Sequence, residues 1–561
     1  MESLRILIIG GYGTFGGRLV RLLADEPCLT LLIAGRSVEK AQAFCDQIVG
    51  AARAIATSFD RDGDVAQLLK SIALDVVVDA SGPFQAYGAD AYRIVEACVA
   101  LRIPYLDLAD DPRFVEGIAQ FDGASKEAGI FVLSGVSTVP TLSTAVIRRL
   151  SCGMATVSDI KGGIAPSPFA GVGLSVVTAI ASYAGKSLRV RRNGHDAKAA
   201  ALIDSRRYTI GPPGRLPMRG LRFSLVDVPD LTLVPKLWPQ LQSHWMGAAP
   251  QPALLHRALS SLAWTVRLHL IPTLKPFSPL FHRVLSAFRW GEKRGGMFIE
   301  ISGSAQNGEQ ITRSWHMIAE GDEGPFVPSI AAAAIIRNSL DGKPPKPGAR
   351  ACTQDIDLED YEKVFVQHGI VTGIRERKPS DAALPLYCQF LGAAWNDLPE
   401  PIRAMHDATG TWIAEGHADI ERGGNPLARI AAFIYRFPKA GRDVPITVTF
   451  EAKHGRETWT RNFAGKRFSS VQYEGSGRDE GLICERFGPL VFAMALVIAD
   501  GKMQLVIRQW SAFGIPLPRF FMPIGNTFES AEDGKFHFHV EIGFAWTGLI
   551  VRYRGWLERK T

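Results

Sequence analysis

Short apolar segments alternate with longer segments of helical periodicity over residues 1–136. Runs such as RILIIG and LTLLIAG are almost uninterrupted, and after each run the apolar residues recur every three or four positions. Strands that are apolar on both sides belong to a parallel sheet with helices on its two faces. The pattern therefore predicts an α/β fold class, with a doubly wound parallel sheet formed by residues 1–136.

The pattern changes twice further along the chain. Residues 137–372 mix strands such as MFIEISGSAQ and TRSWHMIAEGD with a helix near PSIAAAAIIRNSLDG, which predicts an α+β domain. A short basic linker follows, and residues 383–561 are β-rich. There, DVPITVTFEAKHGRETWTRNFAG predicts two strands around a turn at His454-Gly455. We therefore expect three domains.

Composition narrows the class of protein. The formal net charge is +7, and no basic run is interleaved with aromatic residues, which argues against a nucleic-acid partner. The seven cysteines form no CxxC pair, which fits a reducing compartment. The N-terminus lacks the basic segment of a signal peptide, and no apolar stretch reaches the roughly 18 residues of a membrane helix. We expect a cytoplasmic protein.

A glycine-rich loop follows the first predicted strand and precedes a helix. Gly11, Gly13 and Gly16 form the pattern G-x-G-x-x-G in a strand–loop–helix context, the signature of dinucleotide-binding Rossmann domains. Gly11 permits the tight turn, Gly13 lets the backbone approach a pyrophosphate, and Gly16 lets the helix pack on the strand. With Thr14 and Phe15 between them, these residues predict a pyrophosphate site. A glycine turn without a ligand is the alternative.

The end of the second predicted strand bears on the choice of cofactor. NAD enzymes usually carry an acidic residue there for the ribose 2′-hydroxyl, whereas this chain has Gly35, Arg36 and Ser37. Arginine pairs with a 2′-phosphate, which favours NADP over NAD. The alternative is a solvated arginine at a helix start. Asp60 ends the third strand and is a candidate for the adenine amino group or for a helix cap.

Two further strand ends offer candidates for the nicotinamide side of the site. The fourth strand leads into Ser81, Gly82, Pro83 and Phe84, where small residues let the cofactor pass and the last two could form a wall. A turn with a core phenylalanine is the alternative. The fifth strand places Tyr105 and Asp107 on one face, where a phenol or carboxylate could assist proton transfer. Structural hydrogen bonding is the more common role for such residues.

These motifs together resemble a known family. GGYGTFGG, AGRS, DASGPFQAYG, YLDLADD and SGVSTVPT occur in the order found in saccharopine dehydrogenase-like oxidoreductases, over roughly residues 4–150. The resemblance implies a Rossmann domain for NAD(P) and a second α+β domain that closes over the nicotinamide. Two departures, at residues 109–111 and 135–137, lie near the substrate, so we do not transfer the family's substrates. The C-terminal part resembles an uncharacterised domain fused to such dehydrogenases.

Residues 231–291 contain no Asp or Glu but six Lys or Arg, among many Leu, Trp and Phe. Such a stretch could touch an anionic membrane, at the inner face of the cell membrane, or grip an acyl substrate. Packing on its own core is the alternative.

Two sets of residues in the β-rich domain are weaker candidates, one for a metal site and one for a ligand pocket. His537, His539 and Glu541 share a strand face that could hold a metal, but a polar sheet face is the more common reading, and we expect no metal. A pocket for an apolar ligand with an acidic head could be lined by Asp443, Glu451, Trp459, Arg461, Arg508 and Trp510.

From these observations we expect an NADP-dependent oxidoreductase that acts on a small-molecule substrate. Hydride would pass to or from a carbonyl, an imine or an activated alkene, and the substrate could be lipid-like. The alternative is a non-catalytic NADP-binding protein whose C-terminal domain binds a lipid or a protein partner. A homodimer is an open alternative, and the sequence does not identify the proton donor or the direction of the reaction.

Overall fold

The computed structural model describes residues 4–171, 173–321, 323–407, 409–435 and 437–560. The chain forms two compact units, which we describe one at a time. The first contains residues 1–207 and 221–372, and the second contains residues 208–220 and 373–561. In the described part of the chain, no helix combines the length and the apolar character needed to cross a bilayer.

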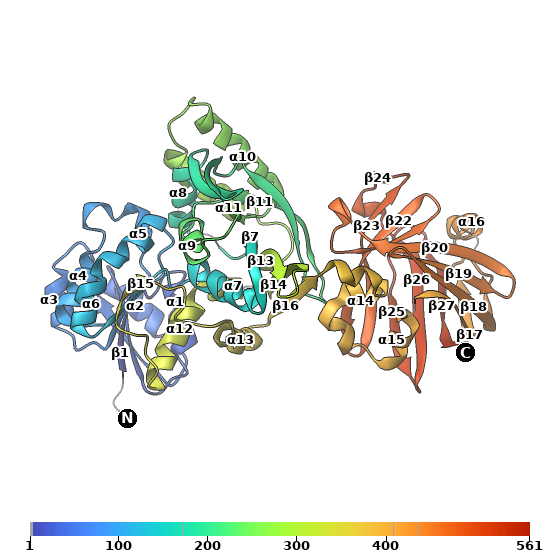
Figure 1. Ribbon diagram of the computed structural model, residues 1–561, viewed down its shortest axis with the longest axis horizontal. Helices are drawn as coiled ribbons and strands as arrows, with labels where there is room; N and C mark the ends of the chain where they lie inside the picture. The colour runs from blue at the N-terminus through green and yellow to red at the C-terminus, as the bar shows by residue number, and fades with distance from the viewer. Residues whose placement is uncertain (1–3, 172, 322, 408, 436, 561) are drawn as a thin grey trace. The chain divides into compact units, whose positions relative to one another are not determined.

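The first unit begins with the predicted parallel sheet, with helices on both faces (Figure 1). Alternate strand residues point to opposite sides, so Leu7 and Leu32 pack under α3 and α4, while Ile6 and Leu31 are equally buried on the other face. Helices α1 and α12 pack together. The doubly wound α/β fold is thus confirmed. Its helices are α1 (Gly16–Leu23), α2 (Val38–Cys45), α3 (Val65–Lys70), α4 (Arg93–Leu101), α5 (Pro112–Gly117), α6 (Asp122–Ala128) and α12 (Val327–Leu340).

The sheet contains a strand that the pattern over residues 1–136 does not predict. From the sequence we place residues 348–351 in the second domain, but they form β15, which pairs in parallel with β6 and completes the first sheet. The segment GARA lacks the apolar run by which we recognised the other strands. The strand order is β15-β6-β5-β4-β1-β2-β3. The strands are β1 (Leu4–Ile9), β2 (Leu29–Gly35), β3 (Arg53–Ser58), β4 (Val76–Asp79), β5 (Tyr105–Asp107), β6 (Phe131–Ser134) and β15 (Gly348–Ala351).

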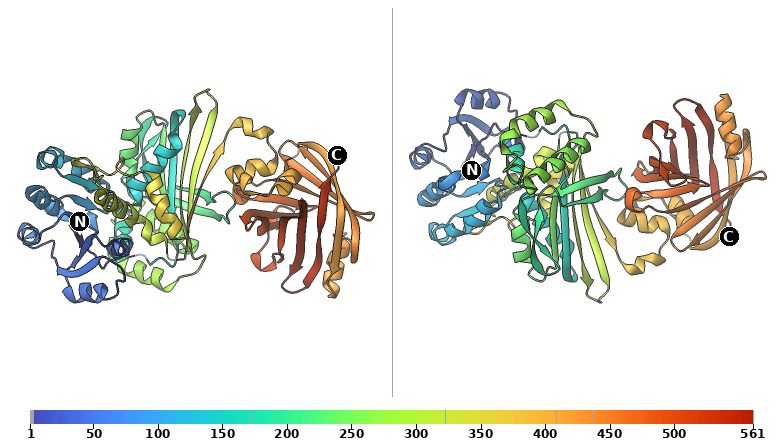
Figure 2. Two further views of the ribbon diagram at one scale, coloured as in Figure 1. Left: turned by 90° about the horizontal axis from the view of Figure 1, so that it is seen from below. Right: turned by 90° about the horizontal axis from the view of Figure 1, so that it is seen from above.

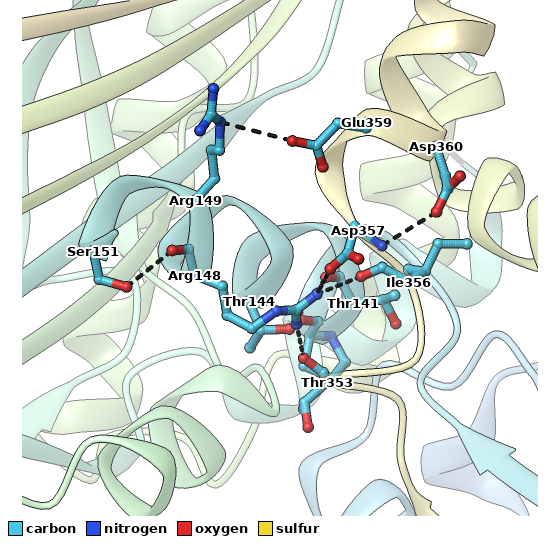
Figure 3. A network of polar contacts seen from close by, with 11 residues as sticks. Thr141, Thr144, Arg148, Arg149, Ser151, Thr353, Ile356, Asp357, Glu359 and Asp360 are labelled. Carbon is cyan, nitrogen blue, oxygen red and sulfur yellow. Dashed lines mark hydrogen bonds and ion pairs between the residues drawn. The ribbon is translucent and has the colours of Figure 1, made fainter. Parts of the chain in front are cut away.

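A polar network holds this returning segment against α7 (Ser143–Ser151) (Figure 3). Arg148 on α7 donates to the carbonyl oxygens of Thr353 and Ile356 and, at 2.9 Å, to the carboxylate of Asp357. Thr141 donates to the carbonyl oxygen of Cys352 at 2.8 Å. Because these carbonyl groups find side-chain donors, the loop between β15 and α13 (Leu358–Gln367) can leave the sheet without losing its hydrogen bonds.

The second half of the first unit is the α+β domain, built on a mixed sheet of nine strands. Its long central strands β7, β13 and β14 are antiparallel neighbours, and β12 pairs in parallel with β7. Helices α8, α10 and α11 enclose a separate apolar cluster that includes Ala181, Ala263 and Leu274. The elements are β7 (Met154–Ala165), α8 (Leu174–Tyr183), β8 (Ser187–Arg192), β9 (His195–Ala200), β10 (Ser205–Ile210), β11 (Met218–Leu225), α9 (Asp230–Leu237), β12 (Ser243–Ala248), α10 (Ala253–Arg267), α11 (Ser278–Ala287), β13 (Arg294–Ala305), β14 (Gln310–Glu320) and β16 (Ile370–Arg377).

The second unit is an antiparallel sheet whose strands return to their starting point (Figure 2). The order runs from β22 through β21, β20, β19, β18, β17, β27, β26 and β25 to β23, and β23 pairs with β22, so the sheet closes on itself. The turn at His454-Gly455 joins β18 and β19, as predicted. The strands are β17 (Gly410–Arg422), β18 (Gly441–Lys453), β19 (Arg456–Phe463), β20 (Lys466–Glu474), β21 (Ile483–Phe487), β22 (Leu490–Ala499), β23 (Lys502–Ala512), β24 (Ile515–Pro516), β25 (Thr527–Glu532), β26 (Lys535–Phe544) and β27 (Gly548–Arg559), with helices α14 (Leu386–Leu391), α15 (Glu400–His406) and α16 (Pro426–Ile434).

The tip of the β10–β11 hairpin belongs to this second unit, although we place its residues in the second domain from the sequence. The carbonyl oxygen of Gly214 accepts a hydrogen bond from the backbone of Ile498 at 2.8 Å, and that of Gly211 accepts one from Arg375 at 2.9 Å. Leu216 packs against the buried cluster that contains Leu482. The closed sheet therefore depends on a segment from the middle of the chain.

A buried carboxyl group, Asp230, lies at the start of α9. Its side chain is fully buried, and burial raises its pKa to about 7, although the hydroxyl of Ser143 opposes this increase. A buried carboxylate is costly without partners, so the folded state favours the protonated acid. The unfolded chain loses this proton near its ordinary pKa of about 4.

We predict that Asp230→Asn removes a pH-dependent loss of stability. Because the pKa is raised in the folded state, the contribution of Asp230 is fully present below about pH 4 and is lost as pH rises to about 7. The variant should gain on the order of 2–4 kcal/mol over the natural chain between these limits, with no further change above them. Urea unfolding from pH 4 to 8 measures the difference, and a constant gap over that range would contradict the prediction.

Candidate functional site

The loop between β1 and α1 brings backbone so close together that side chains are excluded. A Cβ on Gly16 would collide with the carbonyl oxygen of Gly10, and a Cβ on Gly11 would lie 2.8 Å from that of Ile8. The left-handed residue of the turn is Gly10, with φ of +74°, and not Gly11. Gly13 is exposed, and a Cβ on it would lie 3.0 Å from the carbonyl oxygen of Gly10. The motif therefore seats the first turn of α1 on the end of β1.

The N-terminus of α1 has backbone donors without protein partners. Thr14 is exposed, and no residue in the described ranges accepts a hydrogen bond from the N–H groups of Thr14, Phe15 or Gly16. No side chain caps the helix. Because free N–H groups and the helix dipole favour an anion, this cradle fits the pyrophosphate of a dinucleotide. Ser329 of α12 stabilises the loop by donating a hydrogen bond to the carbonyl oxygen of Phe15, at 2.9 Å.

The end of β2 presents an unpaired arginine. The guanidinium of Arg36 is exposed and has no ion pair or hydrogen bond with any part of the chain that the structure describes. A Cβ on Gly35 would lie 2.5 Å from the ring of Tyr12, so glycine here lets that ring cover the strand end. Ser37 caps α2, because its hydroxyl accepts a hydrogen bond from the backbone of Lys40 at 3.3 Å.

Asp60 lies exposed in the loop after β3, at the same carboxyl edge of the sheet. Its carboxylate accepts a hydrogen bond from the backbone of Asp62 at 3.1 Å, which stabilises the turn. The cap of the following helix α3 is Asp64, which accepts from Gln67 at 3.0 Å. The capping role that the sequence allowed for Asp60 therefore belongs to Asp64.

A buried carboxylate fixes the loop after β4. Asp79 accepts hydrogen bonds from the backbone and the hydroxyl of Ser81, at 2.9 and 2.5 Å. The hydroxyl of Tyr87 lies 2.7 Å from that of Ser81, and the guanidinium of Arg61 lies 3.3 Å from the centre of the Tyr87 ring. Burial raises the pKa of Asp79, while Ser81 and Arg61 oppose the increase. Sequence reasoning missed Arg61, which no motif marks.

The loop residues that we predicted to flank the nicotinamide separate into two groups. Ser81, Gly82 and Pro83 are half-buried at the carboxyl edge of the sheet. Phe84 is only 6% exposed, and its ring packs against those of Tyr87 and Phe114, with ring centres 4.9 and 5.0 Å apart. Phe84 thus supports the loop from inside, as in the alternative of a core phenylalanine.

The two candidates on β5 are inside the protein. Tyr105 is fully buried in the core under α3 and α4, and burial raises its pKa well above the ordinary value. Asp107 accepts hydrogen bonds from Ala109, Gly135 and Ser134, at 2.8 to 2.9 Å, and thereby ties the ends of β5 and β6 together. Burial raises its pKa to about 7. This geometry favours the structural alternative for both residues.

A group of half-buried ionisable residues lies beyond the end of β5, and sequence reasoning missed two of its members, Asp227 and Tyr183. Asp110 lies 3.0 Å from the amide of Gln85, and burial raises its pKa. Burial and the nearby Asp111 raise the pKa of Asp227, which precedes α9, to about 6. Tyr183 of α8 lies close to Asp227 and Asp110, and burial raises its pKa. Only tertiary packing brings α8 and the start of α9 to β5, so no local motif could have revealed this group.

Comparisons with known proteins agree with this geometry. Residues 6–133 match the family model of the saccharopine dehydrogenase NADP binding domain, and residues 398–557 match a domain of unknown function (DUF4166). No curated protein matches the chain.

Solved structures are similar at low identity. The apo saccharopine dehydrogenase (L-Glu forming) from Saccharomyces cerevisiae is 13% identical, with a TM-score of 0.49 over 67% of this chain and 100% of that one. The WlbA (WbpB) dehydrogenase from Thermus thermophilus, in complex with NAD and α-ketoglutarate, is 13% identical, with a TM-score of 0.31 over 64% of this chain and 94% of that one. The chain contains a saccharopine dehydrogenase NADP binding domain at residues 6–133 and a domain of unknown function at residues 398–557.

Proposed function

We propose that the protein is an NADP-dependent oxidoreductase that transfers hydride to or from a carbonyl, an imine or an activated alkene of a lipid-like substrate. The observation that carries this proposal is the glycine cradle with the unpaired Arg36 at the neighbouring strand end. Bound NADP would supply the hydride chemistry. The chain contributes the binding of the pyrophosphate by α1 and the orientation of the nicotinamide end at residues 81–83.

The preference for NADP follows from charge. Arg36 lies one residue beyond the end of β2, and no carboxylate occupies position 35 to repel a 2′-phosphate or to bond a 2′-hydroxyl. The first acid after β2, Glu39, accepts a hydrogen bond from Ser37 at 2.7 Å. A guanidinium without a protein partner can form a charge-assisted pair with a phosphate and loses no existing contact in doing so.

We predict that Arg36→Asp weakens NADPH binding by roughly 10- to 100-fold, because a charge-assisted pair is worth about 1.5–3 kcal/mol and the new carboxylate repels the phosphate. Binding of NADH should be unchanged or tighter. Fluorescence titration of both cofactors measures the affinities, with Arg53→Asp, another exposed arginine of this sheet, as the control. Equal affinity of the natural chain for NADPH and NADH would contradict the proposal.

Proton delivery to the substrate is best supported at the acids beyond β5. Tyr105 and Asp107 are fully buried, whereas Asp110, Asp227 and Tyr183 are half-buried near the carboxyl edge. A carboxyl group with a pKa of about 6 remains partly protonated near neutral pH, which suits a general acid. We therefore assign the proton donor for reduction to this group, with Asp227 as its principal member.

We predict that reduction by the natural chain slows as pH rises through about 6, since the raised pKa means that Asp227 loses its proton in that range. Asp227→Asn should remove this pH dependence and lower kcat by about 10²–10⁴-fold. NADPH oxidation with a panel of long-chain aldehydes, ketones and enones measures both effects. Asp196→Asn, at an exposed acid on β9, is the control. Tight NADPH binding without oxidation of any panel member would favour the non-catalytic alternative.

A lipid-like substrate is supported by the surface of α10 and α11. Large apolar side chains are exposed on α10 (Leu254 at 65% and Trp264 at 50%), just after it (Leu268 at 61% and Leu270 at 70%) and on α11 (Leu280 at 56%). Five basic residues of the acid-free stretch have no ion-pair partner within the described ranges: Arg257, Arg267, Lys275, Arg283 and Arg289. A surface with exposed apolar side chains and unpaired basic residues favours binding to an anionic bilayer. The apolar side chains can enter the lipid, and the basic residues can pair with the anionic headgroups. We infer peripheral membrane binding through residues 231–291.

We predict that the natural chain co-sediments with vesicles that contain phosphatidylglycerol and that added salt weakens this binding. Replacing both Trp264 and Leu268 by Ser should weaken it by at least roughly 30-fold, because each side chain that enters the lipid contributes on the order of 1–3 kcal/mol. Val366→Ser, at an even more exposed apolar position on α13, should have no effect. Absence of binding, or an equal loss of binding in the control variant, would contradict the proposal that this surface binds the membrane.

A further inference from the structure

The closed sheet of the second unit contains a cavity of about 120 Å³. Its wall is mostly apolar, with Phe450, Met494, Leu505 and Tyr553 among the lining residues. Small closed sheets fill their interior with side chains, while wider ones can hold a single small ligand. Of the residues that we proposed from the sequence for a pocket here, only Trp459 and Arg461 line this cavity.

One end of the closed sheet is sealed by helices. α14 contacts β20, and α15 contacts β25 and β26, at the end where β17 begins (Figure 1). Tyr387 of α14 donates to Gln472 at 2.7 Å, and His406 of α15 lies 2.7 Å from the carboxylate of Glu529. The rings of Tyr387 and His406 stack with their centres 4.0 Å apart. These contacts close the cavity at this end.

The charged groups inside are already paired. Arg461 donates to Glu485 at 3.2 Å and to Ser470 at 2.8 Å, and Ser470 donates to the same carboxylate at 2.6 Å. Burial lowers the pKa of His406, but Glu529 and Glu457 together raise it above its ordinary value, and the ring nitrogen of His406 is the partner of the Glu529 carboxylate. The interior thus has no excess positive charge for an acidic headgroup, and an unpaired buried carboxylate is strongly unfavourable.

Hydrogen-bond donors with unused N–H groups nevertheless line the cavity. Gln472 lines it and is 1% exposed, and nothing in the described ranges accepts a hydrogen bond from its amide nitrogen. Arg461 has more N–H groups than the two that its protein partners use. A carbonyl or ester oxygen could accept hydrogen bonds from these groups without adding charge.

The opposite end of the sheet is apolar and open to solvent. Lining residues at this end, such as Phe487, Phe492 and Ile542, are half-buried, whereas those near α14 and α15 are buried. The connections at this end expose further apolar side chains: Phe513 at 83%, Ile515 at 65%, Phe520 at 79%, Phe521 at 48%, Ile524 at 55% and Trp546 at 52%. An apolar ligand would enter between these residues.

We propose that the closed sheet is a binding site for one neutral lipid-like molecule, whose carbonyl or ester oxygen accepts hydrogen bonds from Arg461 and Gln472. The hydrocarbon part fills the small cavity with its first few carbons and continues past the exposed apolar side chains at the open end. The Arg461–Glu485 pair selects against a carboxylate headgroup. This site is separate from the dinucleotide cradle, and its occupancy does not depend on the proposed redox function.

Binding of methyl cis-parinarate and of cis-parinarate to the full chain tests this site, because the two probes share a fluorescent chain and differ in headgroup charge. The natural chain should bind the neutral ester at least tenfold more tightly. Ile507→Trp, which fills the cavity, should weaken ester binding at least tenfold, whereas Ile413→Trp, on the exposed side of β17, should not. Circular dichroism and urea unfolding serve as the check that the closed sheet is folded in each variant.

Glu485→Gln provides a second measurement, because it leaves Arg461 without its carboxylate partner. This variant should shift the preference towards the anionic probe by at least tenfold. No saturable binding of the ester, binding that is indifferent to Ile507→Trp, or tighter binding of the acid by the natural chain would overturn the proposal. An unchanged preference in Glu485→Gln would overturn the role of the charge pair.

Discussion

The close approach of backbone to backbone at the end of β1 is the constraint on which the dinucleotide site depends. Gly10 has a left-handed φ, and a Cβ there would lie 2.8 Å from the carbonyl oxygen of Ala80 after β4. Because Gly16 also lies against Gly10, α1 begins directly above the strand end. Its free N–H groups consequently face the carboxyl edge where β2 and β4 end, so that one steric condition aligns three parts of the site.

The parts that could be predicted from sequence are those whose cause is local. The apolar runs of β1 and β2 and the glycines between β1 and α1 carry their own periodicity and sterics, and from them the doubly wound sheet of an NADP binding domain was predicted correctly. The strand β15 was missed, because GARA gains its burial from β6 and not from its own composition. Asp227 was missed because its raised pKa arises from neighbours brought together by packing.

Burial has opposite consequences for the acids of the first unit. Asp107 is enclosed by hydrogen-bond donors and connects β5 to β6, whereas Asp110 and Asp227 keep partial access to solvent. All three have raised pKa values because of burial, so a raised pKa does not by itself distinguish a structural acid from a proton donor. In the function that we propose, access to the carboxyl edge of the sheet makes that distinction.

The hairpin tip formed by residues 208–220 has a consequence for how this chain could have evolved. Residues 208–220 belong to the second unit, residues 221–372 to the first, and the rest of the chain to the second again. The two units are therefore interleaved along the sequence and not arranged end to end. A fragment that begins at residue 373 would lack Leu216 and the carbonyl of Gly214, leaving the cluster around Leu482 and the backbone of Ile498 uncovered. Simple shuffling of a terminal module would therefore yield an incomplete fold, and the closed sheet is expected to be inherited together with the domain that supplies its hairpin.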